Sequence, residues 1–438
     1  MHTHGTQPYR LAETRVKRFS HKPRSVTEVP SAERLPGVTI IRPLRGLDPN
    51  LYYNLESTLA LDYPTERYEV IFALQRENDQ ALDVVRRLME KYQDVDMRVI
   101  TTTEPIGVNP KINNICNPID QAKYDILWVL DATISVTKRS LLDSVAALIS
   151  PEDPTTRPDA EHSSLLYNVS DKKEANDQAF SAEASRVGLV HHVPFAWVPE
   201  KSFGSRLEQA YLNSTHAKMY LAINATGLDS CVVGKSNLYR RSTLNQLQSP
   251  SPSLRGSTNP PTGIAAFSPY LPEDNMIASG IMHQLKLKHR LTPDLALDCL
   301  GPVDVKAYIA RRIRWIRVRR RMVLAATLVE PLTESLLLGV LASWAFRTLF
   351  GVSPILFFLL HEIAWLMVDL RVMKALKGEG LQGAGEFLEF FPAWVCREAL
   401  ALPIWLRAII GDKVNWRGVT YKIQPSGKSN AHFVSTVG

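Results

Sequence analysis

Cysteine is scarce in this sequence, and no two cysteines stand at close spacing. Four occur in 438 residues, at Cys116, Cys231, Cys299 and Cys396. Disulfide frameworks and cysteine-ligated zinc sites depend on several cysteines at short, recurring spacings such as Cys-x-x-Cys. The sequence therefore argues against both, and it predicts a protein that works in a reducing compartment.

Two further features are missing, an apolar N-terminal segment and a large excess of one charge. Residues 1–36 are polar, basic and proline-bearing, without the apolar core of a signal peptide, and we expect them to form a disordered tail. The 51 Lys and Arg residues outnumber the 44 Asp and Glu residues by only 7. This modest excess fits a membrane surface or a phosphate-bearing ligand better than a nucleic acid, and we predict no nucleic-acid partner.

Short apolar runs alternate with helical patterns between residues 38 and 131. Residues 38–44, 68–74, 96–101 and 124–130 predict strands, because they are rich in β-branched and aromatic residues. Residues 51–61 and 81–92 have helical spacing. The alternation predicts an α/β domain over residues 37–321, with helices on both faces of its sheet. Ligands of such sheets bind at the carboxyl ends of the strands, where Asp79 and Asp131 lie.

Two polar segments interrupt this domain, at about residues 150–186 and 248–262. The first is rich in charged residues and the second in Ser and Pro. Both compositions are typical of solvated loops, so we assign no chemistry to either insertion.

The long apolar runs all lie after residue 322, and none of them is free of charge. Residues 322–350, 352–373 and 390–410 are long enough to span or enter a bilayer. The ionisable residues within them are Glu330, Glu334, His361, Glu362, Asp369, Arg397 and Glu398. Because a charge at membrane depth is costly, these groups should face one another, a cavity or the interface. We predict membrane-associated helices over residues 322–411 and a polar tail over 412–438; the alternative is a soluble helical domain.

Three residues near the predicted strand ends are candidates for binding a nucleotide. Asp79 could accept hydrogen bonds from a uracil or ribose, or it could cap the helix that begins near Gln80. Lys111 lies in a turn-rich loop, where it could contact a diphosphate or simply be a surface lysine. Asp131 follows the most hydrophobic strand and could hold a divalent cation, since Mg²⁺ needs few carboxylates besides phosphate oxygens. A capping role is the alternative for Asp131 too.

Adjacent acids at Glu273 and Asp274 precede a helical run that begins near Met276. A carboxylate at such a position can act as a general base if it faces the hydroxyl that it deprotonates. Acidic residues at the start of a helix also serve as caps, so the pattern alone leaves both roles open.

A basic and aromatic helix precedes the first apolar run. Arg311, Arg314 and Trp315 share one face, at spacings i, i+3 and i+4. We expect this face to meet a diphosphate and an acceptor, and the arginines that follow, residues 317–321, to face lipid. Binding of anionic headgroups alone would require no catalysis and is the alternative. By the positive-inside rule, the arginines place the first domain in the cytosol.

In its motifs the sequence resembles the ceramide glucosyltransferase family, whose members have the GT-A nucleotide-sugar fold. The resemblance extends from about residue 38 to about residue 421, apart from the two insertions. The motifs are Arg42-Pro-Leu-Arg-Gly-Leu-Asp-Pro-Asn-Leu, Asn109-Pro-Lys-Ile-Asn-Asn, Lys123-Tyr-Asp-Ile-Leu-Trp-Val-Leu-Asp, Val187-Gly-Leu-Val-His, Leu207-Glu-Gln-Ala-Tyr, Glu273-Asp274 and Arg311-x-x-Arg314-Trp315. It implies a GT-A-type mixed sheet followed by C-terminal membrane helices.

The resemblance also implies roles for individual residues. Asp79 matches the family's first conserved acid, expected at the nucleotide. Asp131 matches the second, expected at the metal and diphosphate, and Asp274 the third, expected to be the base. Arg311, Arg314 and Trp315 match the family's (Gln/Arg)-x-x-Arg-Trp element. His216 matches a histidine associated with substrate binding, although a core histidine is the alternative.

The implied reaction is transfer of glucose from UDP-glucose to the C1 hydroxyl of ceramide with inversion, assisted by a divalent cation, Mg²⁺ or Mn²⁺. The implied location is the cytosolic face of a Golgi or ER membrane, with several spans. Family members usually begin with a transmembrane helix, which residues 1–36 cannot form. Two other functions are kept open: a transferase of the same fold that uses another lipid acceptor, and a non-enzymatic membrane-docking scaffold.

Overall fold

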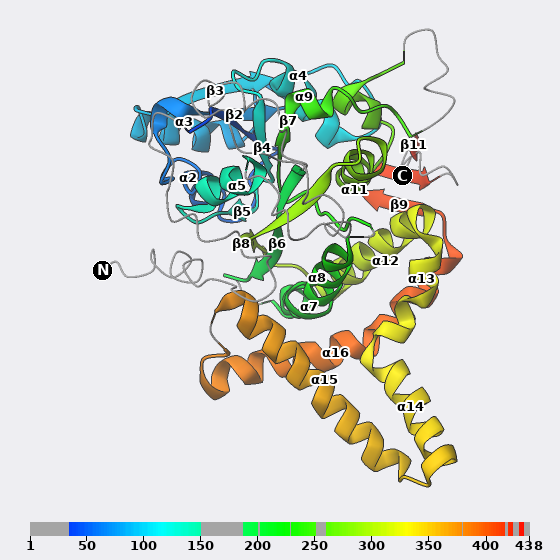
Figure 1. The fold of residues 1–438 in the computed structure, drawn as a ribbon. Helices are drawn as coiled ribbons and strands as arrows, with labels where there is room; N and C mark the ends of the chain where they lie inside the picture. The colour runs from blue at the N-terminus through cyan, green and yellow to red at the C-terminus, as the bar shows by residue number, and fades with distance from the viewer. Residues whose placement is uncertain are drawn as a thin grey trace, which may run out of the picture.

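The computed structural model describes residues 35–149, 187–199, 202–227, 229–250, 260–378, 380–416, 419–423 and 429–432. The predicted N-terminal tail up to residue 34, the first insertion and residues 251–259 of the second lie outside the described residues. In Figure 1 a sheet flanked by helices occupies the upper part of the molecule, and a hairpin of two long helices, α14 and α15, extends away from it.

One eight-stranded sheet organises the first domain, in the order β3-β2-β1-β4-β7-β6-β8-β5. Its strands are β1 (Val38–Pro43), β2 (Tyr68–Leu74), β3 (Asp96–Thr101), β4 (Ile126–Leu130), β5 (Ile134–Ser135), β6 (Val187–Trp197), β7 (Ser236–Arg240) and β8 (Lys288–Cys299). The first four strands of this order are parallel. Strand β7 is antiparallel to β4 and to β6, and β5 is antiparallel to β8, whereas β6 and β8 are parallel. The sheet is therefore mixed, as predicted.

Helices cover both faces of the parallel half because its strands are apolar on both sides. They are α2 (Leu51–Glu56), the short η2 (Thr65–Arg67), α3 (Ala81–Lys91) and α4 (Pro110–Asp120), whereas α5 (Ser140–Ile149) packs against β6 and β8. Along β1, Ile40 packs into the same core as Leu88 of α3. The next residue, Ile41, packs into a second core with Ile115 of α4. This alternation places α3 and α4 on opposite faces.

The remaining helices of the first domain follow the antiparallel strands. They are α7 (Phe203–Tyr211), the π-helical η4 (Leu212–His216), α8 (Ala217–Thr226), α9 (Arg241–Leu244), η5 (Gly263–Phe267), α11 (Glu273–Ser279), the π-helical η6 (Gly280–Gln284) and α12 (Val305–Met322). Segment η4 joins α7 to α8 as one helix with a wide turn, and such π-helical turns are frequent at functional sites.

The C-terminal helices have a largely apolar surface. They are α13 (Leu324–Val329), the 3₁₀ turn η7 (Glu330–Thr333), α14 (Ser335–Phe350), α15 (Pro354–Lys377) and α16 (Gly383–Ile410). Within the described chain, no one helix has both the length and the apolar composition needed to cross a bilayer. Residues Leu324–Thr333 and Ser335–Phe350 meet both requirements only as a pair, which is bent by 68°.

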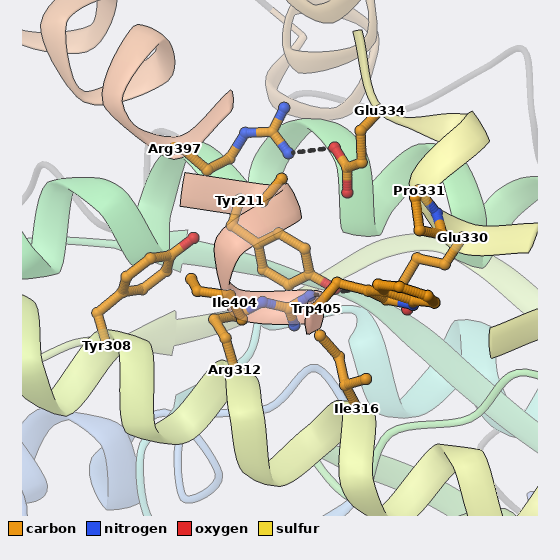
Figure 2. Close-up of a pocket in the computed structure, with 11 residues that line it drawn as sticks. Tyr211, Tyr308, Arg312, Ile316, Glu330, Pro331, Glu334, Arg397, Ile404 and Trp405 are labelled. Carbon is orange, nitrogen blue, oxygen red and sulfur yellow. Dashed lines mark hydrogen bonds and ion pairs between the residues drawn. The ribbon is translucent and has the colours of Figure 1, made fainter. Parts of the chain in front are cut away.

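Each of the seven ionisable residues that the sequence singled out in these helices has a polar partner, as we expected. Arg397 contacts Glu334 (Figure 2), and it also contacts Glu398. Asp369, which is fully buried, lies 2.6 Å from Lys218 Nζ of α8. The other contacts are Glu330 with Arg312 and Arg319, and Glu362 and His361 with Ser335. These contacts join the C-terminal helices to one another and to the first domain.

Residues 413–432, which the sequence assigned to a polar tail, contain a small antiparallel sheet. Its strands are β9 (Lys413–Trp416), β10 (Val419–Ile423) and β11 (Ser429–His432). Val414, Tyr421 and Ile423 are buried in one apolar cluster with Leu271 of the first domain. The alternation of Tyr421 and Ile423 with polar neighbours is the pattern of a strand that is buried on one side.

Candidate active site in the central cleft

A cleft of about 960 Å³ lies at the carboxyl ends of the parallel strands and continues along α8, α12 and α13. Seven of the eight residues that the sequence singled out line it: Lys111, Asp131, His216, Asp274, Arg311, Arg314 and Trp315. They come from segments far apart in the chain. The sheet therefore brings them together as expected, and their individual roles stay predictions.

Lys111 is placed in the cleft by the cap of α4. The Asn109 side chain accepts hydrogen bonds from the Lys111 and Ile112 amides, so α4 begins with Lys111 in its first turn. Lys111 Nζ donates to Asp131 Oδ1 at 2.6 Å and to the Gly234 carbonyl at 2.5 Å. Burial alone would lower the pKa of Lys111, but Asp131 and other nearby carboxylates raise it above its ordinary value. Lys111 is therefore a permanent cation.

Asp131 is held by positive charge on more than one side. Behind it, the wholly buried Arg42 donates to the Ile134 carbonyl at 3.0 Å, and burial lowers the pKa of Arg42 to about 9. Lys235 Nζ lies 3.7 Å from Asp131 Oδ2 and 3.2 Å from Asp298 Oδ1. Asp131 thus faces the cleft with its charge compensated by lysines.

The cleft offers few protein ligands for a divalent cation. Among the described residues no group of three or more His, Cys, Asp or Glu side chains has the arrangement of a metal site. Asp131 is 29% exposed and already pairs with Lys111 through Oδ1. One partly exposed carboxylate fits Mg²⁺ or Mn²⁺ that takes its other ligands from diphosphate oxygens and water.

Glu273 and Asp274 open α11 and are both held by hydrogen bonds. Asn109 Nδ2 donates to Glu273 Oε2 at 2.7 Å. The Gly234 amide donates to Asp274 Oδ2 at 2.5 Å, and the Asn275 amide donates to Oδ1 at 2.8 Å. Burial raises the pKa of both acids, and for Glu273 the adjacent charge of Asp274 raises it further. A carboxylate with a raised pKa is suited to accept a proton near neutral pH.

Asp79, the eighth predicted residue, does not line the cleft. The Gly46 amide donates to Asp79 Oδ1 at 2.8 Å and to Oδ2 at 3.0 Å, and the Ala81 amide also donates to Oδ1. Asp79 therefore caps the start of α3, the alternative considered for it, and holds the loop that carries Arg45 into the cleft. Its direct contact with a nucleotide stays a prediction.

The predicted basic and aromatic face of α12 is present. Asp304 caps this helix by accepting a hydrogen bond from the Ala307 amide. Arg311 Nε lies 3.2 Å from Glu208 Oε1, and the Arg311 guanidinium carbon is 5.2 Å from the centre of the Trp315 ring. These contacts fix Trp315 at the cleft surface while Arg311 retains N–H groups for an anion.

The expectation that the remaining arginines face lipid is wrong for three of them. Arg317 donates to the Arg407 carbonyl at 3.2 Å and Arg320 donates to the Ile409 carbonyl, both in the last turn of α16. Arg319 pairs with Glu330. The last carbonyls of a helix have no partners within it, and cations are favoured there. The arginine run therefore secures α16 against α12.

His216 lies in the π-helical segment, inside an aromatic cluster. Its ring centre is 5.9 Å from that of Trp315 and 5.7 Å from that of Tyr211. Burial, together with nearby arginines of α12, lowers the pKa of His216 to about 3. His216 is therefore neutral at physiological pH, and it supports Trp315 from behind while lining the cleft.

Sequence comparison assigns the chain to a family. The sequence model of glycosyl transferase family 21 matches residues 5–154 and 176–429, which is most of the chain. The chain belongs to glycosyltransferase family 21. This confirms the family resemblance drawn from the motifs and makes the protein a transferase.

Relatives of this family 21 chain match it over nearly its full length. A ceramide glucosyltransferase of Komagataella phaffii is 34% identical, covering 90% of this chain and 84% of that protein. A ceramide glucosyltransferase of Candida albicans is 29% identical, covering 89% and 86%. Among solved structures, a mannosyltransferase from Pyrobaculum calidifontis in complex with GDP-Man and Mn²⁺ is 17% identical, with a TM-score of 0.45, and covers 90% and 91%.

Several cleft residues of the family 21 chain were not singled out from sequence. Arg45 lies in the quoted motif that begins at Arg42, and its basic side chain was the available signal. Gln75 directly follows β2 and donates to the Pro110 carbonyl at the start of α4. Lys235 directly precedes β7. Because β7 is antiparallel to β4, Lys235 lies at the same edge of the sheet as Asp131. Gly234 gave no signal, because its contribution comes from its backbone.

We predict that the family 21 site needs a glycine at position 234 for full turnover. A Cβ atom there would lie 2.8 Å from Lys111 Nζ and 3.2 Å from Asp274 Oδ2. We expect Gly234→Ala to displace both groups and lower turnover by roughly 10-fold to 100-fold, the scale of small misplacements in active sites. Gly385→Ala, where the added Cβ meets no atom within 4 Å, is the matched control. Equal turnover of the two variants would contradict this role.

Proposed function

We propose that the protein transfers glucose from UDP-glucose to the C1 hydroxyl of ceramide with inversion, at the cytosolic face of a Golgi or ER membrane. The observation that carries the proposal is the meeting of Lys111, Asp131, Asp274 and the Arg311–Trp315 face of α12 in one cleft. The names of the relatives support ceramide as the acceptor and glucose as the transferred sugar.

In the proposed reaction the ceramide oxygen attacks the anomeric carbon of UDP-glucose while the bond to the diphosphate oxygen breaks. Asp274 accepts the proton of the attacking hydroxyl, and UDP leaves with the bonding electrons. The fixed charges of Lys111, Arg311 and Arg314 stabilise the negative charge that develops on the departing diphosphate. Such preorganised charges act most strongly in a site shielded from water.

A divalent cation is part of the proposal, with Asp131 as its protein ligand. When bound, Mg²⁺ or Mn²⁺ would neutralise charge on the diphosphate as the sugar is released. Lys235, which lies 3.7 Å from Asp131 Oδ2, keeps that carboxylate oriented toward the cleft.

The C-terminal helices support membrane attachment. Their exposed surface carries large apolar residues, among them Trp344, Leu349 and Ile355. The bent pair of α13–η7 and α14 has the length and composition of a broken span. Contiguous apolar surfaces of this kind mark sites of membrane or protein interaction. The arginines at the end of α12 favour a cytosolic position for the sheet domain.

The test is transfer by the full-length protein, purified in detergent and given labelled UDP-glucose, ceramide and Mg²⁺. We expect one lipid product, identified by mass spectrometry and NMR as β-linked glucosylceramide. UDP-galactose, a sterol and a polyprenyl phosphate serve as alternative substrates. Transfer only to another lipid would replace ceramide as the acceptor, and absence of any UDP affinity in a thermal-shift assay would favour the scaffold alternative.

A further inference from the structure

One stripe of α12 follows the cleft from its charged part toward the C-terminal helices. Arg311, Trp315, Val318 and Met322 all line the cleft. Their spacings of four, three and four residues place them on one helical face. At 1.5 Å per residue the stripe spans about 16 Å. Along that length the stripe changes from arginine and tryptophan to valine and methionine, while Arg319 and Arg321 line the cleft beside its second half.

Apolar residues of two other segments line the cleft together with the end of this stripe. Met219 and Ile223 come from α8, Val323 lies between α12 and α13, and Ala326 comes from α13. Arg319 Nη1 contacts Met219 Sδ at 3.5 Å, so α8 and α12 touch at this level. The cleft therefore has an apolar end, which is built from three segments and is distinct from the Lys111–Asp131–Asp274 cluster.

The apolar end adjoins the surface that we propose to lie in the membrane. On α13, Leu324, Leu328 and Val329 are each more than half exposed. Ala326 of the same short helix lines the cleft, so one helix borders both the cleft and the apolar surface. Figure 1 shows α13 between α12 and the projecting hairpin of α14 and α15.

A hydrocarbon chain is the occupant that these residues fit. The aliphatic side chains at this end offer no hydrogen bonds to a sugar or a peptide, whereas burial of each methylene group is favourable. Met219 and Met322 are flexible and adapt to ligands of different shape. A chain that enters here from the membrane would carry its headgroup along the α12 stripe toward Asp274.

We infer that the apolar end of the cleft, formed by Met219, Ile223, Met322, Val323 and Ala326, is an acyl-chain subsite. It holds one hydrocarbon chain of the lipid acceptor and admits it from the bilayer between α8 and α13. This inference rests on the proposed function for the identity of the acceptor. The methionines make the subsite tolerant of chain length.

The first test narrows the subsite with Ala326→Trp and compares ceramides with long and short acyl chains. We expect kcat/KM for the long-chain acceptor to fall about 10-fold or more, which is the effect of expelling roughly two methylene groups. The short-chain acceptor and UDP affinity should change far less. Leu328→Trp, on the same helix but outside the cleft lining, is the control. Equal losses for both acceptors, or equal effects of both variants, would overturn the subsite.

The second test is independent of catalysis. Ceramide with a photoactivatable group near the end of its acyl chain is bound to the full-length protein, irradiated and mapped by mass spectrometry. Labelling within residues 219–223 and 322–326, competed by unlabelled ceramide and lost in Ala326→Trp, supports the subsite. Labelling without glucose transfer would retain the subsite and reject the proposed function. Transfer with labelling elsewhere would retain the function and reject the subsite.

Discussion

Asp274→Asn is expected to lower the turnover of glucose transfer by about 100-fold or more, the range typical of lost general-base catalysis. The amide keeps the shape of the side chain and can still accept the hydrogen bond from the Gly234 amide, which is 2.5 Å from Asp274 Oδ2. It cannot take a proton from the acceptor hydroxyl. UDP affinity, measured by calorimetry, should therefore remain close to that of the unchanged protein.

The pH profile of kcat/KM gives this prediction a second readout. Burial raises the pKa of Asp274, so its base form is lost at a higher pH than for an ordinary aspartate. Activity should fall as the pH drops through that raised pKa, and this acid limb should be absent in Asp274→Asn. Glu273→Gln is the matched comparison: burial and the charge of Asp131 raise the pKa of Asp274, so the acid limb should remain in this variant.

The adjacent acids Glu273 and Asp274 have different hydrogen-bond partners, and a comparison of their variants tests which of them is the base. Glu273 accepts a hydrogen bond from buried Asn109, whereas Asp274 is bonded to backbone amides. A larger loss of turnover in Glu273→Gln than in Asp274→Asn, with both variants folded, would assign the base to Glu273.

The strands of the parallel half were predictable from sequence because each is a short apolar run between turns. Strand β2 has the bounds of the predicted run, residues 68–74, and all of its residues are buried. The predicted helix over residues 51–61 ends early, at Glu56. There the Ser57 and Thr58 hydroxyls donate to the carbonyls of Asn54 and Leu55 and compete with helical hydrogen bonding.

Hydrogen bonds between side chains and backbone atoms far away in the chain could not be predicted from the sequence. Gly234 connects Lys111 and Asp274 through its carbonyl and its amide, and no side-chain pattern records such a link. Arg317 and Arg320 resembled juxtamembrane arginines because an apolar run follows them. Their partners include the Arg407 and Ile409 carbonyls in the last turn of α16, which only the return of the chain brings near.

The same contacts explain how the C-terminal helices affect the site. Helix α12 carries Trp315 into the cleft on one side and packs against α7 and α16 on the other. Arg312, buried on this second side, stacks on Tyr211, whose ring centre lies 3.3 Å from its guanidinium carbon. A change in the packing of α16 should therefore reach the cleft through α12.

Arg397→Met is expected to produce a large loss of stability. Arg397 is 1% exposed, donates to Glu334 Oε2 at 3.0 Å and contacts Glu398. Figure 2 shows Arg397 and Glu334 beside the ring of Tyr211, with Arg312 of α12 beneath. Removing the cation leaves two buried carboxylates without their main partner, and such a change costs about 3–5 kcal/mol. Thermal unfolding of the detergent-solubilised protein should show a markedly lower midpoint.

Controls separate this charge effect from a simple loss of packing. Arg407→Met, at an exposed position of the same helix, should change stability by less than about 0.5 kcal/mol. The triple variant Glu334→Gln, Glu398→Gln, Arg397→Met removes the carboxylates as well, so it should recover part of the midpoint that the single variant loses. If the triple variant is less stable than Arg397→Met alone, the carboxylates contribute through contacts other than Arg397. That result would show that the ion pairs of Arg397 with Glu334 and Glu398 do not hold α16 against the turn that precedes α14.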